Sequence, residues 1–293
     1  MNLKQLETFV WIANLKSFRL AAEHLCTTQP AISTRISNLE KSLGAALFYR
    51  DNANITLTEK GQELLPFVEN ILAQTEELKF RADTNHAMSG LLRIGISETL
   101  VHTWMPEFLS LIHEEYPAVE VELIVDATVN LSKELLNRSI DIAILMGPIT
   151  APEVINIPIS SYPLHWIVNP DLLIEDKSHP FSEWPIITYA RNTLPFQDIY
   201  RHFKTERKSD VRYYTSSSLS AMIGLVESGV GIATLPREVI REQLTSNQLK
   251  ELHLDWVPSP LQFTISYINQ PARLLITKSV QLAKEIAEQQ ISI

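Results

Sequence analysis

The sequence predicts a multidomain α+β and α/β protein: an N-terminal winged helix-turn-helix, a long linker helix and a C-terminal two-lobed α/β domain. Three patterns lead to this fold class. Residues 17–43 have the pattern of two short helices joined by a tight turn. Apolar residues from 64 to 82 recur at intervals of four and three, as on one side of a long helix. From residue 91 onward, apolar runs alternate with helical patterns, which indicates an α/β sheet.

Residues 3–15 form the predicted first helix, and the helix-turn-helix follows it. Ser17 can cap the next helix, because its hydroxyl can accept a hydrogen bond from a backbone N–H that has no other partner. The sequence at Cys26 breaks that helix, and Thr28 can cap the following one. Pro30 lies in the first turn of this last helix, where a missing N–H costs nothing. We expect Cys26, between the two helices, to be a small buried apolar group, and a redox sensor is the alternative.

The predicted helix at 29–43 has an apolar side and a polar side without carboxylates. Phosphates line both walls of the DNA major groove, and base edges require compact hydrogen-bonding side chains. The pattern therefore favours a recognition helix that enters the major groove, and a small helical bundle with an uncharged face is the alternative. The apolar side consists of Ile32, Ile36, Leu39 and Leu43, and the polar side of Pro30, Ser33, Thr34, Ser37, Asn38 and Lys41.

A short hairpin follows the recognition helix. Gly44 can end that helix, and residues 47–50 and 55–58 are strand-like runs on either side of a polar turn. A hairpin in this position is a wing, and Arg50 at its base could hold a DNA phosphate.

An ordered set of residues through this region matches a known family: Leu6-Glu7-Thr8-Phe9, Ser17-Phe18, Ala21-Ala22, Leu25, Gln29-Pro30-Ala31-Ile32-Ser33, Ile36, Leu39-Glu40, Leu43-Gly44, Leu47-Phe48, Arg50, Leu57-Thr58-Glu59 and Gly61. With this set, residues 1–65 resemble the N-terminal domain of the LysR-type transcriptional regulators. The resemblance implies that the start of the recognition helix contacts double-stranded DNA and that Arg50 contacts the DNA backbone. It departs at the wing tip, where Asp51, Asn52 and Asn54 replace the usual basic residues. The residues predicted to bind DNA are Ser17, Thr28, Gln29, Pro30, Ser33, Thr34, Ser37, Asn38 and Arg50.

Residues 59–89 are predicted to form a long linker helix that ends in a hinge at 86–90. Thr58 can cap this helix, whereas Pro66 inside it removes a backbone donor and predicts a kink. The apolar positions repeat like a coiled-coil seam, which favours pairing with a second helix, and packing of the helix on its own domain is the alternative. In the family that residues 1–65 resemble, this helix mediates dimerisation. The predicted dimerisation residues are Leu64, Val68, Ile71 and Leu78.

Residues 90–293 are predicted to form a two-lobed α/β domain after a winged helix-turn-helix at 1–58. The first set of strands is continuously apolar and separated by helices, which indicates a parallel sheet covered on both faces. The chain then leaves this sheet, builds a second set and returns, so that the predicted lobes are 90–161 with 268–293, and 162–267. The predicted strands are 91–96, 119–125, 140–146, 186–189, 211–215, 232–235 and 261–268. The predicted helices are one ending at 116 and those at 131–138, 197–205, 218–228, 237–245 and 272–290.

Two such halves joined by a double crossover make a clamshell, and its cleft would bind a ligand. Four segments carry a second resemblance: Leu92-Arg93-Ile94-Gly95, Tyr116-Pro117 with Val121, Ile140-Asp141-Ile142-Ala143-Ile144, and Val230-Gly231-Ile232-Ala233-Thr234-Leu235-Pro236. With these, residues 91–293 resemble the LysR-type effector domain, which is similar to periplasmic binding proteins. The resemblance implies a small-molecule effector, with a small carboxylate as the expected class.

Ligands of open α/β sheets bind beyond the carboxyl ends of the strands, where helix N-termini offer N–H donors. Polar side chains follow four of the predicted strands, although each hydroxyl can equally be an ordinary helix cap. Arg191 could supply the counter-charge of a carboxylate, whereas Glu98 would repel a carboxylate if it points inward. The predicted effector-binding residues are Ser97, Thr99, Thr128, Tyr189, Arg191, Ser217 and Ser218.

The net charge of the 293-residue chain is −9, which is unexpected for a DNA-binding protein. Residues 1–65 hold seven Lys or Arg and six Asp or Glu, a balance of +1, so the remaining residues hold −10. A single weakly basic head should bind DNA weakly, because it neutralises few phosphates. We therefore expect several heads to bind an inverted repeat in a promoter together, in a dimer and, as in the family, a tetramer. The resemblance also implies contact with RNA polymerase.

Enzymes and transport proteins are the rival classes. The sequence has no phosphate-binding Gly-Lys-Ser loop, no G-x-S-x-G elbow and no histidine pair at metal-ligand spacing. Its single cysteine excludes an internal disulfide and a cysteine-rich zinc site. We therefore expect no enzyme activity, no metal and no cofactor. A solute-binding receptor with the same clamshell would need an export signal and would not need residues 1–88. Since the sequence shows no leader and no membrane-spanning run, we expect a cytoplasmic protein with no membrane partner.

Overall fold

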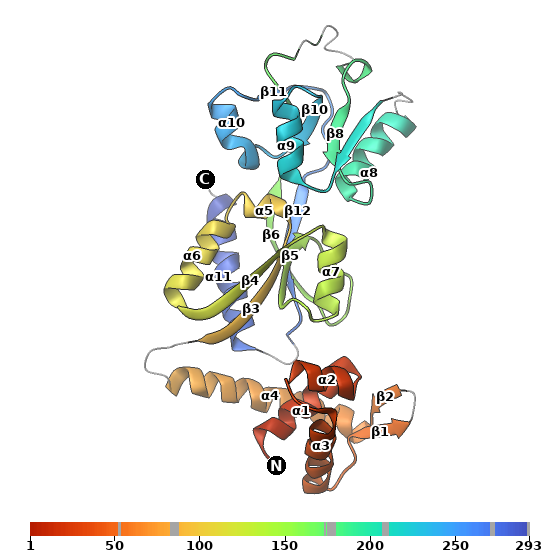
Figure 1. The fold of residues 1–293 in the computed structure, drawn as a ribbon, viewed down its shortest axis with the longest axis vertical. Helices are drawn as coiled ribbons and strands as arrows, with labels where there is room; N and C mark the ends of the chain where they lie inside the picture. The colour runs from red at the N-terminus through yellow and green to blue at the C-terminus, as the bar shows by residue number, and fades with distance from the viewer. Residues whose placement is uncertain are drawn as a thin grey trace.

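A computed structural model gives the structure of residues 1–51, 54–82, 88–172, 174, 180–206, 211–269 and 273–291. Three parts follow one another along the long axis of the molecule (Figure 1). The N-terminal winged helix-turn-helix, here called the head, lies at one end, and the two lobes of the C-terminal domain lie above it. The helix α4 (Glu59–Ala82) leads out of the head and runs beneath the first lobe. This is the mixed α/β multidomain arrangement that the sequence predicts.

The head consists of three helices followed by a hairpin. The helices α1 (Leu3–Leu15), α2 (Phe18–His24) and α3 (Gln29–Leu43) pack around one apolar core. The strands β1 (Phe48–Asp51) and β2 (Asn54–Leu57) pair antiparallel and form the wing. The wing therefore follows the recognition helix directly, as the hairpin pattern indicates.

Local capping explains where these helices begin and end. The hydroxyls of Ser17 and Thr28 each accept the backbone N–H three residues ahead, at 3.2 and 3.4 Å. Gly44 ends α3 with a φ of 68°, a left-handed conformation that costs glycine no steric strain. Cys26 also has a positive φ, 46°, and is exposed. The expectation that Cys26 is buried is therefore wrong, because this residue forms the turn itself and does not lie under the helices.

The predicted seam of α4 is divided between two environments. Val68 is buried in the head core and Leu64 is partly buried against it, so the first turns of α4 pack on their own domain. By contrast, Ile71 is 43% exposed and Leu78 is 67% exposed. A single seam through all four residues is therefore wrong for this chain, since the head already covers half of it. The helix continues through Pro66.

Five strands form the sheet of the first lobe: β3 (Ser89–Ile96), β4 (Ala118–Val125), β5 (Ile142–Met146), β6 (Ile155–Tyr162) and β12 (Leu261–Tyr267). Their order is β4-β3-β5-β12-β6. The first three strands are parallel, as predicted, whereas β12 and β6 are antiparallel to their neighbours, and β6 is not among the predicted strands. Because β12 belongs to this sheet, the predicted lobe boundary at residue 268 lies too late in the chain. Of the predicted hinge at 86–90, residues 86 and 87 lie outside the described residues. Residue 88 precedes β3, and residues 89 and 90 are the first two of that strand.

Helices cover both faces of this sheet, as continuously apolar strands require. They are α5 (Glu98–Val101), α6 (Met105–Glu115), α7 (Thr128–Leu136) and α11 (Leu274–Ile291). Within β5, Ile142 and Ile144 face the core that α6 and α11 cover. Ala143 and Leu145 face the opposite core, which α7 covers. The single helix predicted to end at 116 is two helices, α5 and α6.

The second lobe repeats this plan on a smaller scale. Its strands are β7 (His165–Val168), β8 (Ile186–Tyr189), β9 (Tyr213–Ser216), β10 (Ile232–Leu235) and β11 (Lys250–Leu252), in the order β11-β7-β10-β8-β9. Strands β10, β8 and β9 are parallel, whereas β7 and β11 are antiparallel additions. Its helical segments are η1 (Pro180–Ser182), α8 (Leu194–Tyr200), the π-helical turn η2 (Arg201–Glu206), α9 (Leu219–Glu227), η3 (Arg237–Ile240) and α10 (Arg241–Thr245).

In the described part of the chain, the head contacts the first lobe through α1 and through α4. The centre of the Trp11 ring in α1 lies 3.6 Å from that of the His24 ring in α2, and the guanidinium of Arg138 in the first lobe lies 5.6 Å from the centre of the Trp11 ring. The backbone N–H of Leu274 donates to the Glu76 carboxylate of α4 at 3.0 Å. This arrangement leaves α3 on the side of the head that faces away from the lobes (Figure 1).

Candidate functional site

The polar side of α3 is exposed, and its residues share one face as predicted. The opposite side is fully buried at Ile32, Ile36 and Leu39. Leu43, which the pattern assigns to the buried side, is 38% exposed because the helix ends there. Among the predicted DNA-binding residues of α3, Gln29, Pro30, Ser33, Thr34 and Asn38 are exposed, and Ser37 is half-buried.

The only carboxylate of α3, Glu40, lies apart from this face and connects the helix to the wing. It accepts hydrogen bonds from the backbone N–H groups of Leu47 at 2.8 Å and Phe48 at 3.4 Å. This contact fixes the start of β1 relative to α3. This contact could not be predicted from the sequence, since no local pattern signals a contact across the end of a helix.

Several hydroxyls of the predicted DNA-binding set already have partners within the head. Ser17 and Thr28 are N-caps, and the hydroxyl of Thr34 donates to the Pro30 carbonyl at 2.9 Å. A hydroxyl oxygen that donates its proton still has lone pairs, so Thr34 remains an acceptor for a donor group on a base. Arg50 pairs with Ile55 in the wing, but its side chain lies outside the described part of the chain.

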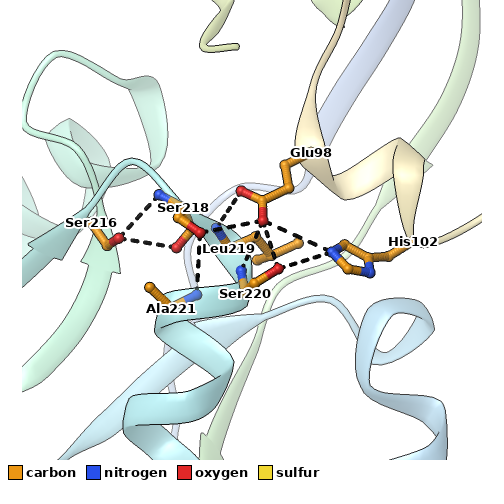
Figure 2. A network of polar contacts seen from close by, with 7 residues as sticks. All are labelled: Glu98, His102, Ser216, Ser218, Leu219, Ser220 and Ala221. Carbon is orange, nitrogen blue, oxygen red and sulfur yellow. Dashed lines mark hydrogen bonds and ion pairs between the residues drawn. The ribbon is translucent and has the colours of Figure 1, made fainter. Parts of the chain in front are cut away.

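The second candidate site lies where the two lobes meet. Figure 2 shows that Glu98, at the start of α5 in the first lobe, points at the N-terminus of α9 in the second lobe. Its carboxylate accepts the backbone N–H groups of Leu219 at 2.6 Å and Ser220 at 3.0 Å. The hydroxyls of Ser220, at 2.7 Å, and Ser218, at 3.3 Å, also donate to it. The side chain of Glu98 therefore joins the two lobes.

The surroundings of Glu98 favour its charged form. Burial by itself would raise the pKa of this carboxyl group, but the hydrogen bonds from Ser220 and Leu219, together with the nearby His102, outweigh burial and lower the pKa. Nε2 of His102 lies 3.9 Å from the carboxylate and 3.3 Å from the Ser220 hydroxyl. A negative charge at a helix N-terminus is also favourable because of the unpaired N–H groups there. Glu98 is therefore ionised at neutral pH.

Two of the predicted effector-binding residues differ from the others in the hydrogen bonding of their side chains. Ser97 precedes α5 and makes no capping hydrogen bond through its side chain. Tyr189 packs against the cores of both lobes, and its hydroxyl is buried without a hydrogen-bond partner among the described residues. Burial first, and then the charge of Glu98, raise the pKa of Tyr189, so that its hydroxyl stays protonated.

The other predicted effector-binding residues are engaged elsewhere or exposed. Thr99 is buried, and the hydroxyl of Thr128 accepts the Met146 N–H at 3.3 Å. Arg191 is exposed and lies over the ring of Phe196 in its own lobe, 5.3 Å from the ring centre. Ser217 is exposed, whereas Ser218 caps α9 and contacts Glu98. The structure thus brings Ser218 and Glu98 together, but it does not direct Arg191 to a carboxylate.

A cavity of about 840 Å³ lies beside the Glu98 contact, and both lobes line it. It shares His102 and Ser220 with that contact, and none of the seven predicted effector-binding residues lines it. Its other walls include Tyr162 from β6, Glu227 from α9 and Glu238 from η3. This cavity could not be predicted from the sequence, because its walls come from segments that only the fold brings together.

In the part of the chain that the structure describes, no group of three or more His, Cys, Asp or Glu side chains could hold a metal ion. No described helix has the length and apolar character that crossing a membrane requires.

Two family models match the chain. Residues 3–62 match the bacterial regulatory helix-turn-helix protein of the lysR family, and residues 85–288 match the LysR substrate binding domain. The HTH-type transcriptional regulator GltR of Bacillus subtilis is 30% identical over 247 residues, which cover 82% of this chain and 81% of GltR. A probable RuBisCO transcriptional regulator of Phaeodactylum tricornutum is 36% identical over 187 residues, which cover 64% of this chain and 60% of that protein.

A solved structure has the same overall fold. It is a cysteine-to-serine mutant of OxyR from Corynebacterium glutamicum with bound hydrogen peroxide, and it is 25% identical to this chain with a TM-score of 0.56. The match covers 99% of this chain and 92% of that one.

Proposed function

Because this chain belongs to the family of LysR-type transcriptional regulators, we propose that it binds promoter DNA through α3 and that a small-molecule effector, bound where its lobes meet, controls transcription. The observation that supports this best is the exposed polar face of α3, which carries no carboxylate. Such a face can lie between two rows of phosphates in a major groove. The alternative, a solute-binding clamshell receptor without a DNA-directed role, gives no reason for this face.

Gel retardation with the DNA upstream of its own gene tests the proposal. We expect specific retardation that weakens as salt is raised, because binding releases counterions from the neutralised phosphates. A shuffled DNA of the same length is the control. Equal retardation of both DNAs, or none, would contradict a regulator and favour the receptor.

We further propose that the exposed part of α4 pairs two chains. Phe67, Ile71 and Leu78 are large apolar residues that the head leaves exposed. Burial of such residues against a second α4 would remove apolar surface from water and hold two heads together. Two paired heads can place their α3 helices in successive major grooves of an inverted repeat, which offsets the weak basic charge of a single head.

The assembly beyond the dimer is proposed from the family. Two dimers would join into a tetramer, and RNA polymerase would be a further partner in the cytoplasm. The protein would act through binding and not as an enzyme.

For an effector to change DNA binding, it must bind one arrangement of the lobes and heads better than another. Thermal melting of the full chain with a set of small metabolites tests for such an effector, and a stabilising compound that leaves DNA retention unchanged would contradict its regulatory role.

A further inference from the structure

The N-terminus of α9 is a complete anion-binding position. The first N–H groups of a helix have no partner within the helix, and the helix dipole favours a negative charge there. In α9, which spans nine residues, Leu219 and Ser220 present two such N–H groups to Glu98, and the third, from Ala221, donates to the Ser218 hydroxyl at 3.2 Å. All three donors are therefore occupied by groups of the same chain.

Glu98 is not needed as a local cap of α9, because Ser218 already has that role. It comes from the other lobe, and about 120 residues of chain separate it from its partners. Its carboxylate accepts four hydrogen bonds from three consecutive residues, all between 2.6 and 3.3 Å (Figure 2). A carboxylate of a bound ligand would use the same donors.

We propose that Glu98 is a specificity-determining residue: it acts as a tethered carboxylate that fills the anion position at α9, so that the effector site takes a neutral or cationic molecule. This inference rests on the proposed effector-binding function of the lobes. A tethered group competes at a high effective concentration, so a free carboxylate must displace an occupant that is always present. The expectation of a carboxylate effector does not fit this arrangement.

The charges around the contact agree with this ligand class. The cavity that shares His102 and Ser220 with Glu98 is lined by three further glutamates, Glu227, Glu238 and Glu242, and by one arginine. An anionic molecule would meet more negative than positive charge there. Close to Glu98, the Tyr189 hydroxyl is buried and has no hydrogen-bond partner in the described part of the chain.

Thermal melting of the full-length protein with sodium formate or sodium chloride at equal ionic strength tests the proposal. In chloride, we expect Glu98→Ala to lower the Tm by about 4 °C or more, because the N–H groups of α9 lose a charged partner. Formate fits the space that the substitution leaves, so it should reverse at least half of the decrease in Tm. Wild type should not respond to formate beyond its response to chloride.

Two further variants separate the role of the Glu98 charge from the general effect of replacing a glutamate. Glu98→Gln fills the same space without a charge, so it should melt below wild type and gain nothing from formate. Glu114→Ala removes an exposed carboxylate from α6, outside the cavity, and should melt like wild type in both salts. A formate response in wild type equal to that of Glu98→Ala, or a Glu98→Gln protein as stable as wild type, would overturn the proposal. DNA retention by wild type is measured separately, so a failure of the proposed function remains distinguishable from a failure of this inference.

Discussion

Two neighbouring hydroxyls on α3 carry the proposed reading of DNA bases. Ser33 and Thr34 are exposed on the polar face, and each can reach a base edge with a short side chain. We predict that Ser33→Ala and Thr34→Ala each weaken binding to the specific DNA by about 1–3 kcal/mol per lost good base contact. Binding to random DNA should change much less, because phosphate contacts remain.

The chain offers a matched control for this measurement. Thr245 in α10 is also an exposed helical threonine whose hydroxyl donates to the carbonyl four residues earlier, at 2.8 Å against 2.9 Å for Thr34. Thr245→Ala should therefore leave both affinities unchanged. Fluorescence anisotropy on the two DNAs gives the comparison, and an equal loss on both would exclude a base-reading role.

A second prediction at the scale of single residues concerns Glu40. Its carboxylate holds the N–H groups of Leu47 and Phe48, so its removal leaves two donors at the base of the wing without this partner. We expect Glu40→Ala to lower the free energy of unfolding of the head by about 1–3 kcal/mol, and Glu40→Gln to lower it less, since an amide oxygen still accepts. Denaturant unfolding followed by circular dichroism measures both. Equal stability of Glu40→Ala and wild type would show that the wing is held by other contacts.

At the scale of elements, α4 has one repeat pattern and two environments. Leu78 is exposed, whereas Val68 is buried in the head core. We predict that Leu78→Asp dissociates dimers in analytical ultracentrifugation without lowering the Tm of the head, because it changes only the exposed part of the helix. Val68→Asp should instead destabilise the head by several kcal/mol, since it places a charge in an apolar core.

Gln62 provides the control for the dimer. It is exposed on the same helix, about 160° around the axis from Leu78 at 3.6 residues per turn, so Gln62→Asp should leave the dimer intact. A Leu78→Asp protein that sediments as a dimer would place the interface elsewhere on the chain.

The contrast between the exposed Leu78 and the buried Val68 shows how much of the fold and site could be predicted from sequence. Caps and apolar spacing are local, and they correctly predict α3 with its exposed face and most strands of both lobes. The burial of Val68 cannot be predicted from neighbouring residues in the sequence, because it depends on how the head packs against α4. The direction of β12 is not local either, since an apolar run looks the same in a parallel and an antiparallel pair.

The proposed effector site is the least predictable part for the same reason. Strand ends draw attention to Ser218, which contacts Glu98 in the structure, and the sequence places Glu98 beside the start of the first helix of the first lobe. The partners of Glu98 lie about 120 residues away in the other lobe, so its orientation follows only from the packing of the lobes. The cavity walls at Tyr162 and Glu238 come from segments without any signal in the sequence.

At the scale of the whole molecule, we predict that His24 couples the position of the head to pH. The pKa of His24 is lowered by burial first, and then by repulsion from Arg273 and Arg93, with a smaller contribution from Arg138 and an opposing one from Asp141. The ring of Trp11 packs against it at an interplanar angle of 37°. A lowered pKa means that the docked arrangement favours neutral His24. Docking is therefore fully stable above the usual histidine pKa of about 6.5 and weakens as the pH falls below it.

We predict that the radius of gyration of the wild-type protein, measured by small-angle X-ray scattering, increases between about pH 7.5 and about pH 5.5 as the head separates from the first lobe. His24→Phe keeps an aromatic ring on Trp11 but cannot acquire a charge, so this variant should stay docked over the same range. Equal expansion of both proteins would assign the change to another titrating group, and no expansion of wild type would contradict the coupling. Because α3 faces away from the lobes in the docked form, undocking would change the orientation of the two heads on DNA and not the accessibility of their recognition helices (Figure 1).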